Sequence, residues 1–213
     1  MEFLALLWDI AVHLDKHLAA LLAQHGVWVY AILFLIIFAE TGFVVTPFLP
    51  GDSLLFVAGA LCGAGSMDIW VLNGTLIAAA VLGNSVNYSI GRYLGPKVFH
   101  WETSRFFNKA ALMKTHVFYE QHGGKTLVIT RFIPILRTFA PFVAGIGAMS
   151  YGRFQAYNLS GALLWVVSLS VAGYFFGNLP FIQNNLTLVI FAIIFISVLP
   201  AIIGYLKHRR AAQ

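Results

Sequence analysis

The chain has 213 residues, of which 60% are hydrophobic and only 10% are charged, and its mean hydropathy is +0.83. Soluble domains carry about 25% charged residues, so this composition excludes a soluble globular protein and predicts an integral membrane protein. The net charge of +5 does not indicate a nucleic-acid partner, because the basic residues lie in the connections between apolar runs, where the positive-inside rule expects them.

Residues 1–24 predict an amphipathic helix in the membrane interface. Leucines and alanines spaced by three or four residues form one stripe, and Glu2, Asp9 and Lys16 lie on the opposite side. No basic region precedes a cleavage pattern, so we expect no cleaved signal peptide. Neither the histidines nor the single cysteine, Cys62, has partners at ligand spacing, so we expect no metal and no cofactor.

The first apolar run starts at Gly26 and is interrupted by Glu40. Beyond it, an apolar stretch is broken by two prolines and a glycine, with Asp52 directly after the break; the breaking residues are Pro47, Pro50 and Gly51. Proline removes a backbone donor and clashes with the preceding turn. Because broken backbone at membrane depth needs cover from protein or a water-filled cavity, this stretch predicts a re-entrant hairpin.

Residues 69–91 contain no charged residue and are long enough to cross about 30 Å of hydrocarbon, which predicts a span. Asn84, Asn87 and Tyr88 lie in its later half, where they suit close helix packing or border a site. Residues 97–125 are the strongly charged interior stretch and are expected outside the hydrocarbon, on the cytoplasmic face.

The segment from Arg131 to Gly145 sets two arginines, Arg131 and Arg137, in a stretch otherwise apolar enough to enter a membrane. Each arginine near a bilayer centre costs about 2.5–3.5 kcal/mol, so the pair needs a cavity, a counter-charge or a bound anion. Pro134 and Pro141 predict breaks between and after the arginines. We interpret the segment as a second re-entrant hairpin and the anion-binding half of a transport site. The alternative is a surface loop whose arginines contact lipid headgroups.

The carboxyl-terminal part has no charged residue between Arg153 and Lys207, and a polar turn near residues 177–185 divides it into two predicted spans. The final span is expected at residues 186–206, and residues 207–213 form a basic cytoplasmic tail. Counting basic residues in the connections places both termini in the cytoplasm. The first hairpin then enters from the outer side and the second from the cytoplasm.

Two short matches indicate an internal duplication within one transmembrane domain over residues 25–206. Ala58-Gly59 matches Ala144-Gly145 at an offset of 86, and residues 91–95 match residues 173–177 at an offset of 82. The halves cover about residues 26–95 and 104–177; chance remains an alternative in a glycine-rich chain. The predicted fold is an all-α integral membrane protein, an inverted repeat with two opposed re-entrant helical hairpins, about four full transmembrane helices and amphipathic interfacial helices.

Opposite charges from the two halves suggest a transport site where the hairpin tips meet. Arg131 and Arg137, with Thr138 beside them, are the candidate substrate-binding residues, because arginine forks match phosphate oxygens in geometry and charge. Glu40 and Asp52 are the candidate proton-coupling residues, since desolvation and a neighbouring arginine shift carboxylate protonation in opposite directions. The alternative is two static buried ion pairs that hold the hairpins together.

Three runs resemble the DedA family of bacterial membrane proteins over about residues 25–205. They are Phe48-Leu-Pro50-Gly51-Asp52-Ser-Leu-Leu, Gly91-Arg92-Tyr-Leu-Gly95 and Arg131-Phe-Ile-Pro134-Ile-Leu-Arg137-Thr-Phe-Ala-Pro141-Phe-Val-Ala-Gly145. The resemblance implies a lipid scramblase or transporter of the bacterial cytoplasmic (inner) membrane that returns undecaprenyl phosphate, with a link to the proton-motive force. By motif, the essential charged residues of the family fall on Glu40, Asp52, Arg131 and Arg137.

We therefore expect a flippase for a polyprenyl-phosphate lipid, with protons and this lipid as partners and a homo-oligomer left open, and not an enzyme. One rival is a proton-coupled antiporter for small cations or drugs, with Glu40 and Asp52 as cation ligands. The other is a lipid phosphatase, which would want a histidine nucleophile; no histidine occurs in residues 126–206.

Overall fold

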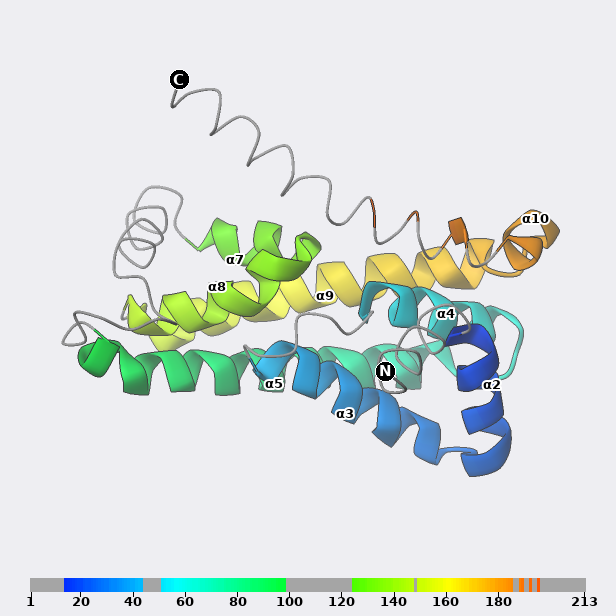
Figure 1. Ribbon diagram of the computed structural model, residues 1–213, viewed down its shortest axis with the longest axis horizontal. Helices are drawn as coiled ribbons and strands as arrows, with labels where there is room; N and C mark the ends of the chain where they lie inside the picture. The colour runs from blue at the N-terminus through cyan, green and yellow to red at the C-terminus, as the bar shows by residue number, and fades with distance from the viewer. Residues whose placement is uncertain are drawn as a thin grey trace, which may run out of the picture. The chain divides into compact units, whose positions relative to one another are not determined.

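The computed structural model describes residues 14–43, 51–98, 124–147 and 149–185, and singly residues 188, 189, 192 and 195. Every regular element in these ranges is helical (Figure 1). Several predicted features lie outside the described residues: residues 1–13, the prolines at 47 and 50, most of the 97–125 connection, most of the final span at 186–206, and the basic tail.

The helices follow the chain in a simple order, with one short 3-10 helix (η1). Their bounds are α2 Leu14–His25, α3 Trp28–Gly42, α4 Gly51–Gly63, α5 Ile69–Val98, α7 Lys125–Ile129, η1 Thr130–Phe132, α8 Pro134–Ile146, α9 Tyr151–Phe176 and α10 Pro180–Asn184. Gly26, at φ +53°, ends α2. Asp68 caps α5, because its Oδ1 accepts hydrogen bonds from the backbone N–H groups of Trp70 and Val71 at 2.8 and 2.9 Å.

Two described helices are long and apolar enough to cross a membrane, at Ile69–Leu94 of α5 and Tyr151–Phe176 of α9. At about 1.5 Å per residue, each stretch of 26 residues is about 39 Å long, more than a hydrocarbon core of about 30 Å. The predicted span at residues 69–91 is therefore confirmed as a helix of sufficient length. The 13-residue helices α4 and α8 reach only about 20 Å, which is too short to cross.

The chain divides into two compact units, each assembled from separate stretches of sequence. Unit 1 comprises Met1–Ile36, Leu49–Leu76 and Val166–Gln213, and unit 2 comprises Ile37–Phe48 and Ile77–Trp165. Helices α3, α5 and α9 each begin in one unit and end in the other.

In unit 1, α4 packs closely against the last part of α9. A Cβ atom on Gly59 would collide with the backbone carbonyl of Ser170, and one on Gly173 would collide with the carbonyl of Phe56. The Asn178 side chain donates a hydrogen bond to the carbonyl oxygen of Ala60 at 2.9 Å. Helix α2 also contacts α4. Small residues thus allow the α4 and α9 backbones to approach closely, as is common between membrane helices.

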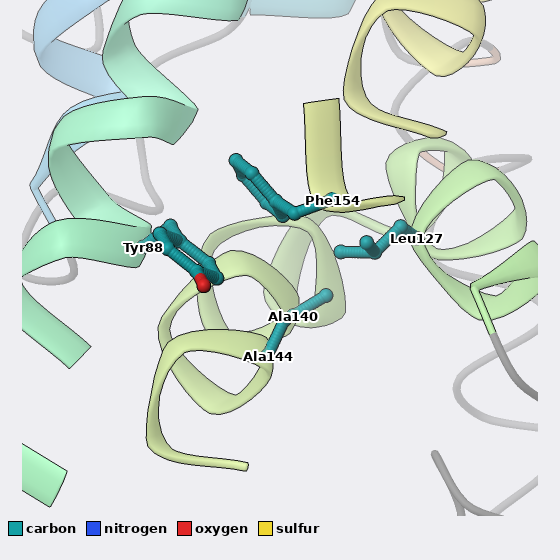
Figure 2. Close-up of a cluster of buried hydrophobic side chains, with 5 residues drawn as sticks. All are labelled: Tyr88, Leu127, Ala140, Ala144 and Phe154. Atoms are coloured by element: carbon teal, nitrogen blue, oxygen red, sulfur yellow. The ribbon is translucent and has the colours of Figure 1, made fainter. Parts of the chain in front are cut away.

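In unit 2, α8 packs in the same manner against the later half of α5. A Cβ atom on Gly145 would collide with the carbonyl of Tyr88, and one on Gly91 would collide with the carbonyl of Phe142. Beside this contact lies an apolar cluster contributed by α5, α7, α8 and α9 (Figure 2); its members are Tyr88, Leu127, Ala140, Ala144 and Phe154. The rings of Tyr88 and Phe154 stack at 4.3 Å between centroids.

The two contacts have the same register, and this gives the two sequence offsets a physical meaning. Both short helices carry Phe-Val-Ala-Gly, at residues 56–59 and 142–145, which are 86 positions apart. Their partner residues on the long helices, Ser170 and Gly173 against Tyr88 and Gly91, are 82 positions apart. Each offset therefore belongs to one partner of a repeated helix pair, which supports the duplication.

Candidate functional site

The two arginines flank a break in the helix. Helix α7 continues into η1, which holds Arg131, and the chain then becomes extended at Ile133, with φ −119° and ψ 106°. Pro134 opens α8 at its first turn, where a proline is tolerated because its missing N–H has no partner there anyway. Arg137 follows one turn later. Pro141, where the sequence also predicts a break, lies inside α8, which continues without interruption to Ile146.

Arg137 is paired with Glu40 in the interior of unit 2. Nη2 of Arg137 (α8) forms a salt bridge with Oε1 of Glu40 (α3), and the two side chains are 3% and 0% exposed. The guanidinium carbon lies 4.8 Å from the ring centroid of Trp165 (α9), which is itself fully buried. Ion pairing and the aromatic face both stabilise a cation removed from water. The structure thus brings together Glu40, predicted as a proton-coupling residue, and Arg137, predicted as a substrate-binding residue.

Asn87 of α5 holds the two helices that carry this ion pair. Its side-chain amide donates hydrogen bonds to the backbone carbonyls of Thr41 at 3.1 Å and Thr138 at 2.8 Å. These threonines directly follow Glu40 and Arg137, so one buried amide fixes the end of α3 and the start of α8. Thr138 is fully buried, and its backbone carbonyl accepts this hydrogen bond.

Arg131 has different surroundings from Arg137, although it is equally buried, at 2% exposure. Its Nη2 donates to Asn158 of α9 twice, to the backbone carbonyl at 3.2 Å and to the side-chain oxygen at 2.5 Å. Its Nη1 is buried and has no hydrogen-bond partner among the described residues. The side chain lies against Gly161, where an added Cβ would sit 3.1 Å from Nε. A neutral amide, not a carboxylate, therefore faces this guanidinium.

A chain of side-chain amides and hydroxyls extends from Arg131 across α9 and α5. Asn84 donates to the Oδ1 atom of Asn158 at 3.0 Å, and Asn158 donates to the Oε1 atom of Gln155 at 3.1 Å. Gln155 in turn donates to the hydroxyls of Ser85 and Tyr151, both at 2.6 Å. The Oδ1 atom of Asn84 is buried without a hydrogen-bond partner in the described residues.

The charges of this buried site do not balance among the described residues of unit 2. The two guanidinium groups of Arg131 and Arg137 repel one another, and Glu40 supplies a carboxylate to Arg137. Leaving a cation buried without a counter-charge is costly, and such a site is suited to an anion. The orphaned Nη1 of Arg131 is the atom at which an anionic oxygen would complete the hydrogen bonding.

The remaining predicted residues have other positions. Asp52 lies in unit 1, in the first turn of α4, and is 7% exposed; Gly51 begins that helix. Within the part of the chain that the structure describes, no three histidine, cysteine or carboxylate side chains are grouped as a metal site would require. Sequence reasoning missed Asn158, Gln155 and Trp165. A useful signal was available for the first two, since amides three residues apart mark one face of an otherwise apolar helix.

Comparison with known proteins decides the family. The VTT domain family matches residues 49–175. Protein DedA of Escherichia coli K12 is 55% identical over 214 residues, covering 100% of this chain and 98% of that protein. The chain belongs to the DedA family. An uncharacterized membrane protein of Mycobacterium leprae is 45% identical over 182 residues (84% and 82% of the two chains). Inner membrane protein YghB of E. coli K12 is 35% identical over 191 residues (86% and 82%).

This DedA-family protein is therefore a membrane protein, in agreement with its composition and its two long apolar helices. No solved structure matches the chain. The matched domain contains Asp52, both buried arginines and Asn158, whereas Glu40 lies before it. The ion pair thus joins a residue outside the matched range to one inside it.

Proposed function

We propose that this DedA-family protein translocates a polyprenyl-phosphate lipid, with undecaprenyl phosphate as the expected substrate, across the bacterial cytoplasmic membrane. The observation that carries the proposal is the buried guanidinium of Arg131, which has an unpartnered Nη1 and no carboxylate among its described partners. A phosphate monoester brings a charge of about −1.5 to −2 and acceptor oxygens that suit an arginine fork.

In this mechanism the two arginines have unequal roles. Arg131 provides the open cationic contact for the phosphate, and Arg137 adds positive potential while Glu40 and Trp165 hold it in place. An arriving phosphate competes with Glu40 for Arg137, so the carboxylate loses part of its counter-charge and becomes easier to protonate. Glu40 is therefore the proposed site of proton uptake, and Asp52 is proposed as a second proton-coupling acid.

The proposed membrane arrangement is an inverted repeat in which α4 and the α7–η1–α8 segment enter the membrane without crossing it. Support comes from their length, about 20 Å for α4 and α8, and from the repeated Phe-Val-Ala-Gly contact. Helix α7 with η1 is shorter still, and buried backbone of this kind is tolerated at membrane depth only where protein covers it. We propose that both termini lie in the cytoplasm, because the positive-inside rule assigns the basic connections to that side.

The direct test is reconstitution into liposomes with labelled undecaprenyl phosphate, with leaflet exchange measured with and without a pH gradient. Wild type is expected to exchange the lipid. Arg131→Ala is expected to raise the half-saturating lipid concentration by about 30-fold or more, since truncating a buried charged contact costs at least about 2 kcal/mol. Arg153→Ala is the matched control, because Arg153 is exposed at the start of α9, and it should behave as wild type.

Coupling is tested with Asp52→Asn and Glu40→Gln in the same liposomes. Both variants are expected to lose the response to the pH gradient, because neither side chain can then take up a proton. Absence of wild-type exchange under either condition would exclude the proposal.

Two rival functions give different outcomes. A cation antiporter would dissipate a pH gradient on addition of a small cation and would not need Arg131; the pairing of Glu40 with Arg137 speaks against that use of Glu40. A phosphatase acting on a polyprenyl diphosphate would release inorganic phosphate, which the same liposomes would reveal.

A further inference from the structure

We infer that Asn158 is a positioning and specificity-determining residue, which orients Arg131 with a neutral amide and so keeps the whole guanidinium charge available for the phosphate of the lipid. The inference rests on the proposed function, and it concerns an amide on α9 that lies far in sequence from the arginine segment. It explains how a buried cation can be held firmly without a counter-charge among its described partners.

The contacts fix the Arg131 side chain in one orientation. Both hydrogen bonds from Nη2 end on Asn158, one on its backbone and one on its side chain. Gly161, three residues later on the same helix, leaves room for the arginine stem, with Nε and Cδ at 3.1 and 3.2 Å from the position of an added Cβ. The guanidinium is thereby held against α9 by Nη2, and Nη1 is buried without a hydrogen-bond partner in the described part of the chain.

The amide of Asn158 is itself fixed by its neighbours. Its Nδ2 donates to the backbone carbonyl of Val81 and to Oε1 of Gln155, both at 3.1 Å. With its donor engaged on that side, its single oxygen faces Arg131 and also accepts from Asn84 at 3.0 Å. The hydrogen-bonding network therefore specifies an oxygen acceptor beside Arg131 without a negative charge.

A carboxylate at this position would have the opposite consequence. Aspartate has nearly the shape of asparagine, but it would place a charged carboxylate oxygen at the hydrogen bond to Nη2 of Arg131, and the resulting ion pair would neutralise the guanidinium. Arg137 illustrates this alternative in the same unit, because Glu40 already supplies its counter-charge. The contrast between the two arginines assigns lipid phosphate binding to Arg131 and depends on residue 158 being an amide.

The test is Asn158→Asp in the full-length protein, with Asn87→Asp as its control. Both are buried amides whose Nδ2 donates to two acceptors, so each substitution loses two hydrogen bonds and sets a carboxylate oxygen against two acceptors. Of the two amides, Asn158 is the one whose oxygen accepts a hydrogen bond from an arginine in the described residues. The unfolding temperature in detergent is therefore expected to stay at least about 3 °C higher for Asn158→Asp than for Asn87→Asp, because the carboxylate at position 158 gains an ion pair with Arg131.

Binding is measured in the same samples with polyprenyl phosphate and, as the uncharged probe, the corresponding polyprenol. The phosphate lipid is expected to raise the unfolding temperature of wild type while the polyprenol does not, and Asn158→Asp is expected to lose this difference. In liposomes the half-saturating concentration of polyprenyl phosphate should rise at least tenfold for Asn158→Asp. If Asn158 had only a packing role, both aspartate variants would lose stability and both would still bind the phosphate lipid.

The outcomes separate the two proposals. An Asn158→Asp protein that is no more stable than Asn87→Asp, or that retains phosphate-dependent stabilisation, overturns the inference. A wild-type protein that is stabilised by polyprenyl phosphate but does not exchange it between leaflets removes the proposed transport and leaves the role of Asn158 standing. A wild type that shows neither effect removes both.

Discussion

Units 1 and 2 share one packing device and differ in what surrounds it. In each unit, a short helix with Phe-Val-Ala-Gly presses its glycine onto a long helix, and a glycine of the long helix faces the carbonyl of the phenylalanine. The backbone contact is the same in kind and in register. Such contacts rely on small residues and close approach, and they require no charged group.

The difference lies in the buried polar residues. Unit 2 surrounds its contact with buried charged and amide side chains; they are Glu40, Asn84, Asn87, Arg131, Arg137 and Asn158. Unit 1 buries Asp52 and Ser53 at the start of α4, and its long helices are joined by a hydrogen bond from Ser170 to Asn73 at 2.7 Å. The repeated contact is thus a scaffold, and the arginine chemistry belongs to one of its two copies.

The largest effect should come from removing the carboxylate that unit 2 places against an arginine. Glu40→Leu leaves Arg137 buried without its ion-pair partner, which costs about 3–5 kcal/mol. Thermal or denaturant unfolding in detergent measures the loss. The double variant Glu40→Leu/Arg137→Met is the control: an apolar pair of similar volume should recover most of the stability and none of the lipid exchange. Wild-type stability in the single variant would show that the pair contributes little.

The next effect tests whether the repeated contacts are equivalent. Gly59→Ala in unit 1 and Gly145→Ala in unit 2 each force a methyl group against a backbone carbonyl, and each should cost about 1–3 kcal/mol. Gly152→Ala, where no atom lies within 4 Å of the added Cβ, is the control and should cost nothing. Similar losses of stability in the two units would support the equivalence of the two helix contacts. A loss in one unit and not in the other would contradict it.

Much of the architecture was predictable, because length and hydropathy depend on local sequence. Residues 69–91 are apolar over a span length, and α5 covers them; the proline at 134 follows a true break between the arginines. Burial of opposite charges in an apolar chain also predicted that an acid and an arginine would meet, as Glu40 and Arg137 do. The matching dipeptides lie at the repeated contact between a short and a long helix in each unit.

The unpredicted part depends on contacts between distant segments. Nothing local distinguishes Arg131 from Arg137, yet one faces an amide 27 residues later and the other a carboxylate 97 residues earlier. The proline at 141 lies within α8 because a helix can lose one backbone hydrogen bond when its remaining packing is intact. The construction of each unit from both sequence halves is a matter of tertiary packing, which periodicity does not encode.

A smaller effect is expected from removing one amide side chain in each unit, the buried Asn87 of unit 2 or the half-buried Asn73 of unit 1. Asn87→Ala removes two donors that join α3 to α8 in unit 2, and it should cost about 1–2 kcal/mol, since hydrogen bonds between membrane helices contribute about 0.6 kcal/mol on average. Asn73→Ala removes the acceptor of one hydrogen bond from Ser170 in unit 1 and should cost about half as much. Unfolding in detergent gives both values. Equal losses of stability in the two variants would contradict the role of Asn87 in joining α3 to α8.

The smallest effect has the opposite sign, and it concerns two glycines of one helix. Gly74→Ala in α5 adds a methyl group with no atom within 4 Å, so it should stabilise the protein by up to about 1 kcal/mol through helix propensity. Gly83→Ala, nine residues later, should destabilise it, because the new Cβ would collide with the Thr41 hydroxyl and lie 2.8 Å from the carbonyl oxygen of Phe38 on α3. Unfolding in detergent measures the change in stability of both variants. If Gly83→Ala were also stabilising, α3 would not lie as close to α5 as the structure shows. The position of Glu40 beside Arg137 depends on that close approach, so this result would contradict the ion pair as well.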